Sequence, residues 1–280
     1  MKLKTLVAAL VAAAAAPAFA TVSPGISQSG ANASYSGNGE LFLTVFDSVA
    51  KTSYTLDLGV TQNAFPAASG STGLAQSWAV NDANFTSFLS QVSVANLGWA
   101  VMALDATGGT AVGGVRLFTT LRNGDEGEFV NLTNQLFTNG TGSAQMGTFF
   151  SGINTTGTHG VAGVAPNFAV NGSSVNKDSD SGNGYFGEGS VGLSTNLNGN
   201  ATFSVANAVG TTSNFYYLGR SGSNQLDTVL VDPFATTFQF ASTGSGYVLS
   251  ASPVPEPESV ALLLAGLGVV GMMVRRRRIG

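Results

Sequence analysis

Three acidic residues lie within four positions of one another, at Asp125, Glu126 and Glu128. A glycoside hydrolase needs two carboxyl groups roughly 5 to 10 Å apart with different pKa values, so these acids are candidates for that chemistry. Apolar residues follow them at helical spacing, and acidic side chains at the start of a helix interact favourably with its dipole. Capping of a helix is the favoured interpretation, and we assign no catalytic residue.

A second group of oxygen-bearing side chains follows further along the chain. Asn176, Asp178 and Asp180 occupy alternate positions and Glu188 comes after them, as in a calcium loop built from carboxylate and amide oxygens. In an EF-hand aligned from Asn176, however, Ser181 stands where the tight turn needs glycine, and the final acid comes one position late. A weak calcium site and a solvated turn both stay open, and no other cofactor is predicted.

The remaining residues offer little for catalysis, because the sequence has one histidine and no cysteine. His159 has no identifiable acidic partner or nucleophile and is expected in a surface loop. Tryptophans can stack on sugar rings. Trp99 lies in an apolar run and is expected in the core, whereas Trp78 is the better candidate for exposure. We therefore expect a protein that is not an enzyme.

Charge excludes one class of partner. Charged residues make up 9% of the chain, well below the roughly 25% of an average soluble domain. Between residues 21 and 252, five basic residues stand against thirteen acidic ones. Such a body cannot neutralise a row of phosphates, so nucleic acid is excluded as a partner. Its surface should be polar through hydroxyl and amide groups, which suits neutral hydrogen-bonding partners such as polysaccharide.

Residues 21–252 are expected to form one mainly β domain, an antiparallel β-sandwich-like fold of two packed sheets with one or two short helices at its edge. Alternating apolar residues at 41–46 and 54–60 predict a hairpin with one buried face. Apolar residues at helical spacing behind Asp82 and behind Asp125 predict the short helices. Further strands are expected at 99–104, 115–121, 201–205, 214–218, 236–240 and 247–250, and loops or weak edge strands at 152–200.

The first twenty residues have the pattern of a secretory signal peptide. Two lysines precede an apolar stretch at 6–16, and Ala18 and Ala20 form a small-x-small cleavage site. The apolar stretch is too short to span a hydrocarbon core, which needs roughly 20 residues. We expect cleavage after Ala20 and an exported body.

The last segment combines a stiff tether, an apolar stretch and a basic cluster. Residues 253–257, which end in Pro255, Glu256 and Pro257, are expected to form a stiff, exposed tether and not helix or interior strand, because proline lacks an N–H and restricts the residue before it. Residues 259–274 are uncharged and mostly apolar, and as a helix they would span about 24 Å, slightly short of a bilayer core of about 30 Å. We predict a transmembrane helix whose following basic cluster stays inside the cell. This cluster consists of Arg275, Arg276, Arg277 and Arg278.

These three parts, in this order, resemble the PEP-CTERM sorting signal of Gram-negative bacteria, here at residues 253–280. The resemblance implies that an inner-membrane exosortase with a catalytic cysteine cuts near the Pro-Glu-Pro step. It also implies that the body is released, or transferred toward the cell surface and its exopolysaccharide matrix. An ordinary membrane anchor is the alternative, although an anchor does not require the Pro-Glu-Pro step. Residues 215–218 and 236–240 resemble the closing region of uncharacterised PEP-CTERM proteins, which implies no activity.

Three functions remain open for the body. The favoured one is an exported surface or extracellular-matrix protein, tethered to the inner membrane before processing by exosortase and then associated with exopolysaccharide in a biofilm. A secreted glycan-active hydrolase that uses the acids near Asp125 is the second. A self-assembling structural subunit is the third, since edge strands with little charge permit pairing between copies.

Overall fold

The computed structural model describes residues 39–65, 73–105, 111–141, 149, 150, 152–154, 156, 172–180, 184–187, 197 and 201–254. The expected signal peptide, transmembrane segment and basic cluster therefore lie outside the described residues. Among the residues it does describe, no helix has both the length and the apolar character needed to cross a bilayer.

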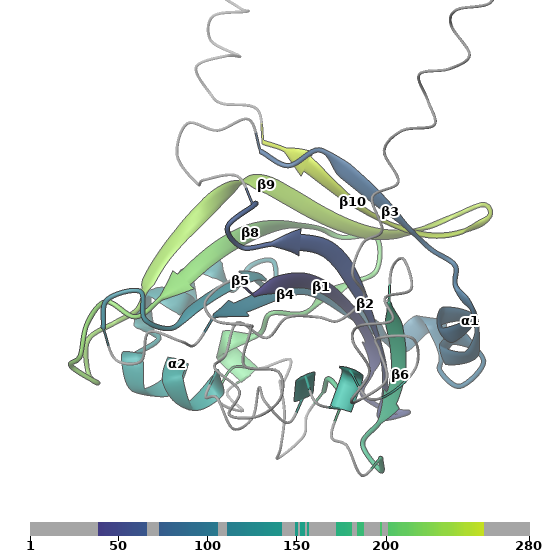
Figure 1. Ribbon diagram of the computed structural model, residues 1–280, viewed down its shortest axis with the longest axis horizontal. Coiled ribbons are helices and arrows are strands. Elements are labelled where there is room, and N and C mark those ends of the chain that lie inside the picture. Colours follow the sequence, from purple (N-terminus) through teal and green to yellow (C-terminus); the bar gives the residue numbers. More distant parts are fainter. Residues whose placement is uncertain are drawn as a thin grey trace, which may run out of the picture.

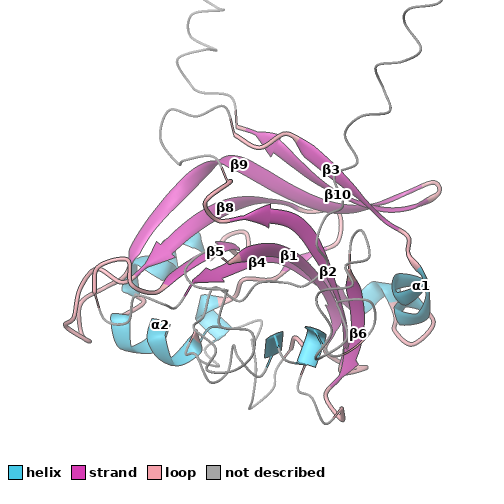
Figure 2. Ribbon diagram, in the orientation of Figure 1, coloured by secondary structure: helices cyan, strands magenta, loops and turns pink. Residues whose placement is uncertain are grey.

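One antiparallel sheet of ten strands forms the frame of the body (Figures 1 and 2). Its order is β3-β10-β9-β8-β5-β4-β1-β2-β6, and β7 pairs with β4 beside this path. The strands are β1 (Glu40–Asp47), β2 (Thr52–Thr61), β3 (Gln76–Val80), β4 (Leu97–Asp105), β5 (Arg116–Thr120), β6 (Ser173–Lys177), β7 (Asn207–Ala208), β8 (Thr212–Gly219), β9 (Leu230–Thr243) and β10 (Gly246–Pro253).

Short helices connect the strands and cover the sheet. The α-helices are α1 (Ala83–Leu89) and α2 (Asn134–Gly140), and the 3₁₀ turns are η1 (Val94–Asn96), η2 (Glu126–Asn131) and η4 (Ala201–Phe203). In Figure 2, α1 lies beside the end of the sheet that carries β6, whereas α2 lies under β5. The mainly β prediction with a few short helices is thus confirmed.

The sheet curls so strongly that its two halves face each other. The rings of Trp99 in β4 and Phe240 in β9 lie 6.4 Å apart, although two strands separate β4 from β9 in the sheet order. Trp78 in β3 donates from Nε1 to the carbonyl oxygen of Leu58 in β2 at 3.0 Å. The sandwich-like arrangement therefore exists within one continuous sheet, and the expected two separate sheets are a single one, because neighbouring strands stay paired around the curl.

Two hydrophobic cores result, one on each face of the sheet. The enclosed core lies between the two halves of the sheet and includes Leu43, Tyr54, Trp99 and Phe240. The covered core lies on the other face, where Phe42 and neighbouring strand residues pack against side chains from short helices and loops. Successive side chains of a strand point to opposite faces, so Leu43 and Phe42 of the same strand enter different cores.

Most of the predicted elements are present. The hairpin is formed by β1 and β2, which pair in the register Leu43 with Leu56, and Asp82 caps α1 by accepting from the backbone N–H of Phe85 at 2.9 Å. Edge strand β6 lies within 152–200, as expected, and β3 was not predicted.

Two predictions need correction. The helix expected behind Asp125 is broken into η2 and α2, because Thr133 caps a new helix by accepting from the N–H of Leu136 at 3.3 Å. The strand expected at 201–205 begins instead as η4, whose Phe203 packs on Phe129 with the ring centroids 5.5 Å apart.

Candidate functional site

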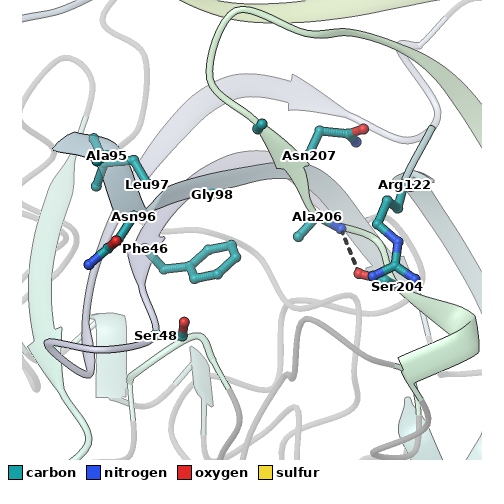
Figure 3. A pocket seen from close by; sticks show the side chains of 11 residues that line it. Phe46, Ser48, Ala95, Asn96, Leu97, Gly98, Arg122, Ser204, Ala206 and Asn207 are labelled. Carbon is teal, nitrogen blue, oxygen red and sulfur yellow. Dashed lines mark hydrogen bonds between the residues drawn. The ribbon is translucent and has the colours of Figure 1, made fainter. Parts of the chain in front are cut away.

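An open pocket of about 310 Å³ lies on the covered face of the sheet (Figure 3). One side is formed by the end of β1, turn η1 and the start of β4, and the other by Arg122 and residues 204–208. This volume is at the lower end of the range for small-molecule sites, about 300 to 1,000 Å³. Residues 204–208 follow Gly98 by more than one hundred positions in the sequence, so only the fold brings them to the pocket.

The floor of the pocket is the ring of Phe46, which lies across the backbone of Gly98. A Cβ on residue 98 would come within 2.5 Å of the Phe46 ring. Gly98 pairs with Phe46 on one side and with Ala208 of β7 on the other. The missing side chain therefore lets an aromatic ring lie flat where three strands meet.

Asp47 holds one rim in place. Its Oδ1 accepts from the backbone N–H groups of Val49 and Ala50 at 2.8 and 3.0 Å, and its Oδ2 accepts from that of Ser93 at 3.0 Å. Burial alone would raise the pKa of Asp47, but these backbone hydrogen bonds and one from the Asn96 side chain lower it below its ordinary value. An ionised Asp47 therefore joins the β1–β2 turn to the segment before β4.

The opposite rim is held by backbone and amide contacts. The N–H of Arg122 donates to the carbonyl oxygen of Ser204 at 2.9 Å. Asn207 donates from Nδ2 to the carbonyl oxygen of Leu121 at 2.9 Å and accepts from the N–H of Asn123 at 3.1 Å. These contacts fix residues 204–207 beside the end of β5. The strand predicted at 201–205 overlaps this segment only at residues 204 and 205.

The chemistry of the pocket is that of neutral hydrogen bonding. Ser48, Asn96 and Ser204 offer hydroxyl and amide groups around an apolar floor. The guanidinium of Arg122 is paired with the carboxylate of Asp125, so its charge is compensated. The described residues that line the pocket include no carboxylate and no histidine, and they offer no side chain suited to general acid or base catalysis.

The acids singled out in the sequence do not line this pocket, although Asp125 pairs with Arg122, which does. Asp125 is at the N-cap position of η2, with Glu126 and Glu128 in its first turn, as the capping interpretation predicts. The Asp125 carboxylate makes no capping hydrogen bond and pairs with Arg122 instead. Glu126 accepts from the backbone N–H of Gly124 at 2.7 Å. Two of the three acids therefore have local structural partners.

The calcium candidates are engaged in separate contacts. Asn176 is buried and donates from Nδ2 to the hydroxyl of Thr156 at 3.0 Å. Asp178 forms an ion pair with Lys51 at 2.9 Å, and Asp180 accepts from the backbone N–H of Lys177 at 2.6 Å. Across the described part of the chain no group of three or more acidic or histidine side chains could hold a metal. Glu188 and His159 lie outside that part, so calcium binding stays a prediction.

Trp78 does not have the exposure expected of it. Only 6% of its surface is accessible, and its ring packs on Phe238 in the enclosed core. The expectation failed because residues 76–80 form a strand whose alternate side chains face inward. Trp99 is fully buried, as predicted.

The sequence did not reveal the pocket. Its lining is mostly small, neutral and scattered over the chain, and none of these residues belongs to a motif. The one local signal is Asn96-Leu97-Gly98, where a glycine stands at the start of an apolar run. Glycine in a strand often marks the close approach of another group.

The body ends where the tether begins. Pro253 is the last residue of β10, one position beyond the expected domain boundary at 252, and Val254 donates from its N–H to the carbonyl oxygen of Ala235 at 3.1 Å. Pro255, Glu256 and Pro257 follow outside the described residues. The tether expected at 253–257 therefore does not begin free of the sheet, because Pro253 is the end of β10 and Val254 is bonded to β9.

Comparison with known proteins identifies this tail. A family model described as the PEP-CTERM protein-sorting motif matches residues 253–278. No curated protein and no solved structure matches the chain. The match covers the Pro-Glu-Pro step, the apolar stretch and the basic cluster that the sequence set apart. The chain therefore carries a PEP-CTERM sorting motif, and this motif supports export and processing by exosortase at the membrane.

Proposed function

We propose that the processed body is a non-enzymatic surface or extracellular-matrix protein that associates with exopolysaccharide. The observation that carries the proposal is the sorting motif at 253–278, which accounts for export and processing. The composition of the body supports the second step, because a surface with few charges and many hydroxyl and amide groups matches the hydrogen-bonding groups of a neutral glycan. The pocket has the same chemistry around an aromatic floor.

Processing is tested by the mass of the protein recovered from outside the cell. We expect loss of residues 1–20 and of the segment after the Pro-Glu-Pro step in cells that have exosortase. In cells that lack the enzyme, the full tail should remain. A full-length tail on the extracellular protein in both strains would contradict the proposal.

Binding is tested with the body, residues 21–254, and exopolysaccharide from the producing strain. Saturable binding with unchanged polysaccharide length is expected. The variant Ser48→Trp places a large ring at the pocket mouth and should weaken binding. Ser245→Trp, at the exposed tip of the β9–β10 hairpin, is the matched control and should bind as the wild type does. Shortened polysaccharide chains would favour the hydrolase instead.

A self-assembling subunit is the second candidate, and strand β3 favours it. β3 ends one side of the sheet, and its five residues, Gln76–Val80, include no charge and no proline. Uncharged edge strands pair readily with other chains. If copies associate through this edge, the body should grow in mass with concentration in size-exclusion light scattering. Ala79→Lys should then abolish the growth, whereas Thr237→Lys on β9 should not.

A further inference from the structure

The sorting motif overlaps the folded sheet. The matched segment starts at residue 253, and Pro253 is still paired with Thr236 of β9. Ser252 is paired with Thr237, whose hydroxyl donates to the Ser252 carbonyl oxygen at 3.3 Å. The first residue of the Pro-Glu-Pro step thus follows directly on a residue that is hydrogen-bonded to the body.

A third segment holds this strand end from the other side. The backbone of Gly73 packs so closely that a Cβ there would come within 2.9 Å of the Pro253 Cα and 1.9 Å of the Ala235 carbonyl oxygen. Next to it, the N–H of Leu74 donates to the hydroxyl of Thr236 at 2.9 Å. Residues 252–254 therefore lie in a clamp made of β9 and the segment at 73–74.

This clamp conflicts with the needs of a processing enzyme. An enzyme that cuts within a chain binds its substrate in an extended form, through residues on both sides of the bond. The residues before the Pro-Glu-Pro step are 252–254, and their backbone groups are partly used by β9. Each extended residue adds at most about 3.6 Å, so the Pro-Glu-Pro step cannot reach far from the body while the clamp is closed.

We propose that residues 252–254 must detach from β9 and from the 73–74 segment before exosortase can cut the tail. The clamp then sets the rate at which the folded body is processed. Only three residues, at the end of β10 and directly after it, need to detach. Such local opening requires a small part of the global unfolding free energy. The core residues of β10, Leu249 and Ala251, keep their places. This inference rests on exosortase processing at the motif.

A disulfide across the clamp gives the direct test, since the full chain has no cysteine and the exported body is in an oxidising compartment. The double variant Ser252→Cys and Thr237→Cys joins a directly opposed pair at the clamp. Val248→Cys with Ala241→Cys joins another opposed pair on the same two strands. The two pairs are four residues apart on each strand and so have the same pairing geometry. The second variant is therefore a matched control.

In cells with exosortase, we expect the oxidised 252–237 variant to persist as the unprocessed precursor, while the 248–241 variant and the wild type are processed. Thiol labelling measures the oxidised fraction, and a pulse of reductant should restore processing of the locked precursor. Gly73→Ala, which disturbs the clamp at a residue with φ of 23°, should be processed faster than the wild type, with thermal unfolding confirming that it is folded.

Processing of the oxidised 252–237 variant at the wild-type rate would overturn the inference and leave exosortase processing intact. Equal retention of both disulfide variants would also overturn it, because the position of the crosslink would then be irrelevant. A wild type that stays unprocessed in the presence of exosortase would overturn the proposed function itself, and the inference with it.

Discussion

The two faces of the sheet bury similar side chains by different means. In the enclosed core the packing partners are other strands of the same sheet together with α1, as in the contact between Trp99 and Phe240. In the covered core Phe42 meets Phe149 and Phe150, which lie outside the strands, at 5.7 and 5.6 Å. One core is thus closed by hydrogen-bonded strands, and the other by short segments that the sheet itself does not fix.

The covered face also buries polar side chains whose atoms have no hydrogen-bond partner. Thr44 and Asp57 lie on the same face of the sheet as Phe42. Thr44 lies between Leu43 and Val45, which point into the enclosed core, and Asp57 is directly opposite Phe42 on the neighbouring strand. Both are fully buried, and neither Thr44 Oγ1 nor Asp57 Oδ2 has a hydrogen-bond partner among the described residues. Buried polar atoms without partners cost stability. These two atoms therefore lower the stability of the covered face.

Removal of one ring from each core sharpens this contrast. Phe240→Ala should destabilise the body by about 3 to 5 kcal/mol, because the cavity lies among fixed strands. Phe42→Ala should cost roughly 1 kcal/mol less, since short segments can collapse into the space. Urea unfolding of the body measures both. Equal costs would show that the covered face is as rigid as the enclosed one.

Asp57 makes the covered face sensitive to pH. Burial, and next the charge of Glu40, raise the pKa of Asp57 to about 8, despite a hydrogen bond from the N–H of Gly59. Between about pH 4 and pH 8 the unfolded chain ionises at this residue while the folded chain keeps its proton, so stability falls as the pH rises. Asp57→Asn should remove that slope and stabilise the body at pH 8 by on the order of 2 to 4 kcal/mol.

Asp47, at the other end of the same strand pair, is the control with the opposite sign. Its lowered pKa stabilises the fold above the pKa of the unfolded chain, and this contribution is lost as the pH falls through the folded value. Asp47→Asn should therefore destabilise at neutral pH. Thermal unfolding between about pH 2 and pH 9 separates the two residues, and parallel pH profiles for both variants would contradict the assignment.

A smaller effect is expected at the edge of the enclosed core. Asp82 caps α1 and also accepts from the hydroxyl of buried Tyr54 at 2.5 Å. Asp82→Ala should cost about 2 kcal/mol, because it removes a cap and leaves a buried hydroxyl without its acceptor. Asp82→Asn keeps one oxygen that can cap α1, while its Nδ2 can donate to the Tyr54 hydroxyl, so it should cost less. Similar losses for the two variants, measured by urea unfolding, would argue against this dual role.

The sequence predicted those elements whose signal is local. The hairpin of β1 and β2 alternates regularly, and α1 has both a capping residue and a helical apolar pattern. Strand β3 was not predicted, because it has five residues and only Trp78 and Val80 face inward. The single curled sheet was not predicted for a different reason. The residues of β4 and β9 do not show whether two strands that face each other across a core belong to one continuous sheet or to two separate sheets.

The functional features also differ in whether their signal is local in the sequence. The sorting motif is contiguous and could be recognised from residues 253–280 alone. The pocket joins residues of β1, β4 and the 204–208 segment, and its shape depends on nonlocal pairings such as Gly98 with Ala208. The clamp on residues 252–254 also depends on a nonlocal contact, because Gly73, which contributes to it, lies far from these residues in the sequence.

The smallest effect is expected outside both cores, at the β1–β2 turn. Lys51 pairs with Asp178 at 2.9 Å, but its side chain is 62% exposed, and exposed ion pairs contribute about 0 to 1 kcal/mol. Lys51 also has a φ of 49°, a left-handed conformation that costs a non-glycine residue roughly 1 kcal/mol or more. Lys51→Ala should therefore destabilise by less than about 0.5 kcal/mol. Lys51→Gly loses the same ion pair yet relieves the backbone, so it should be at least as stable as the alanine variant, despite the greater freedom of glycine in the unfolded chain. If glycine proved the less stable of the two in urea unfolding, relief of the left-handed backbone would be smaller than the cost of glycine's freedom in the unfolded chain, and the prediction would be wrong.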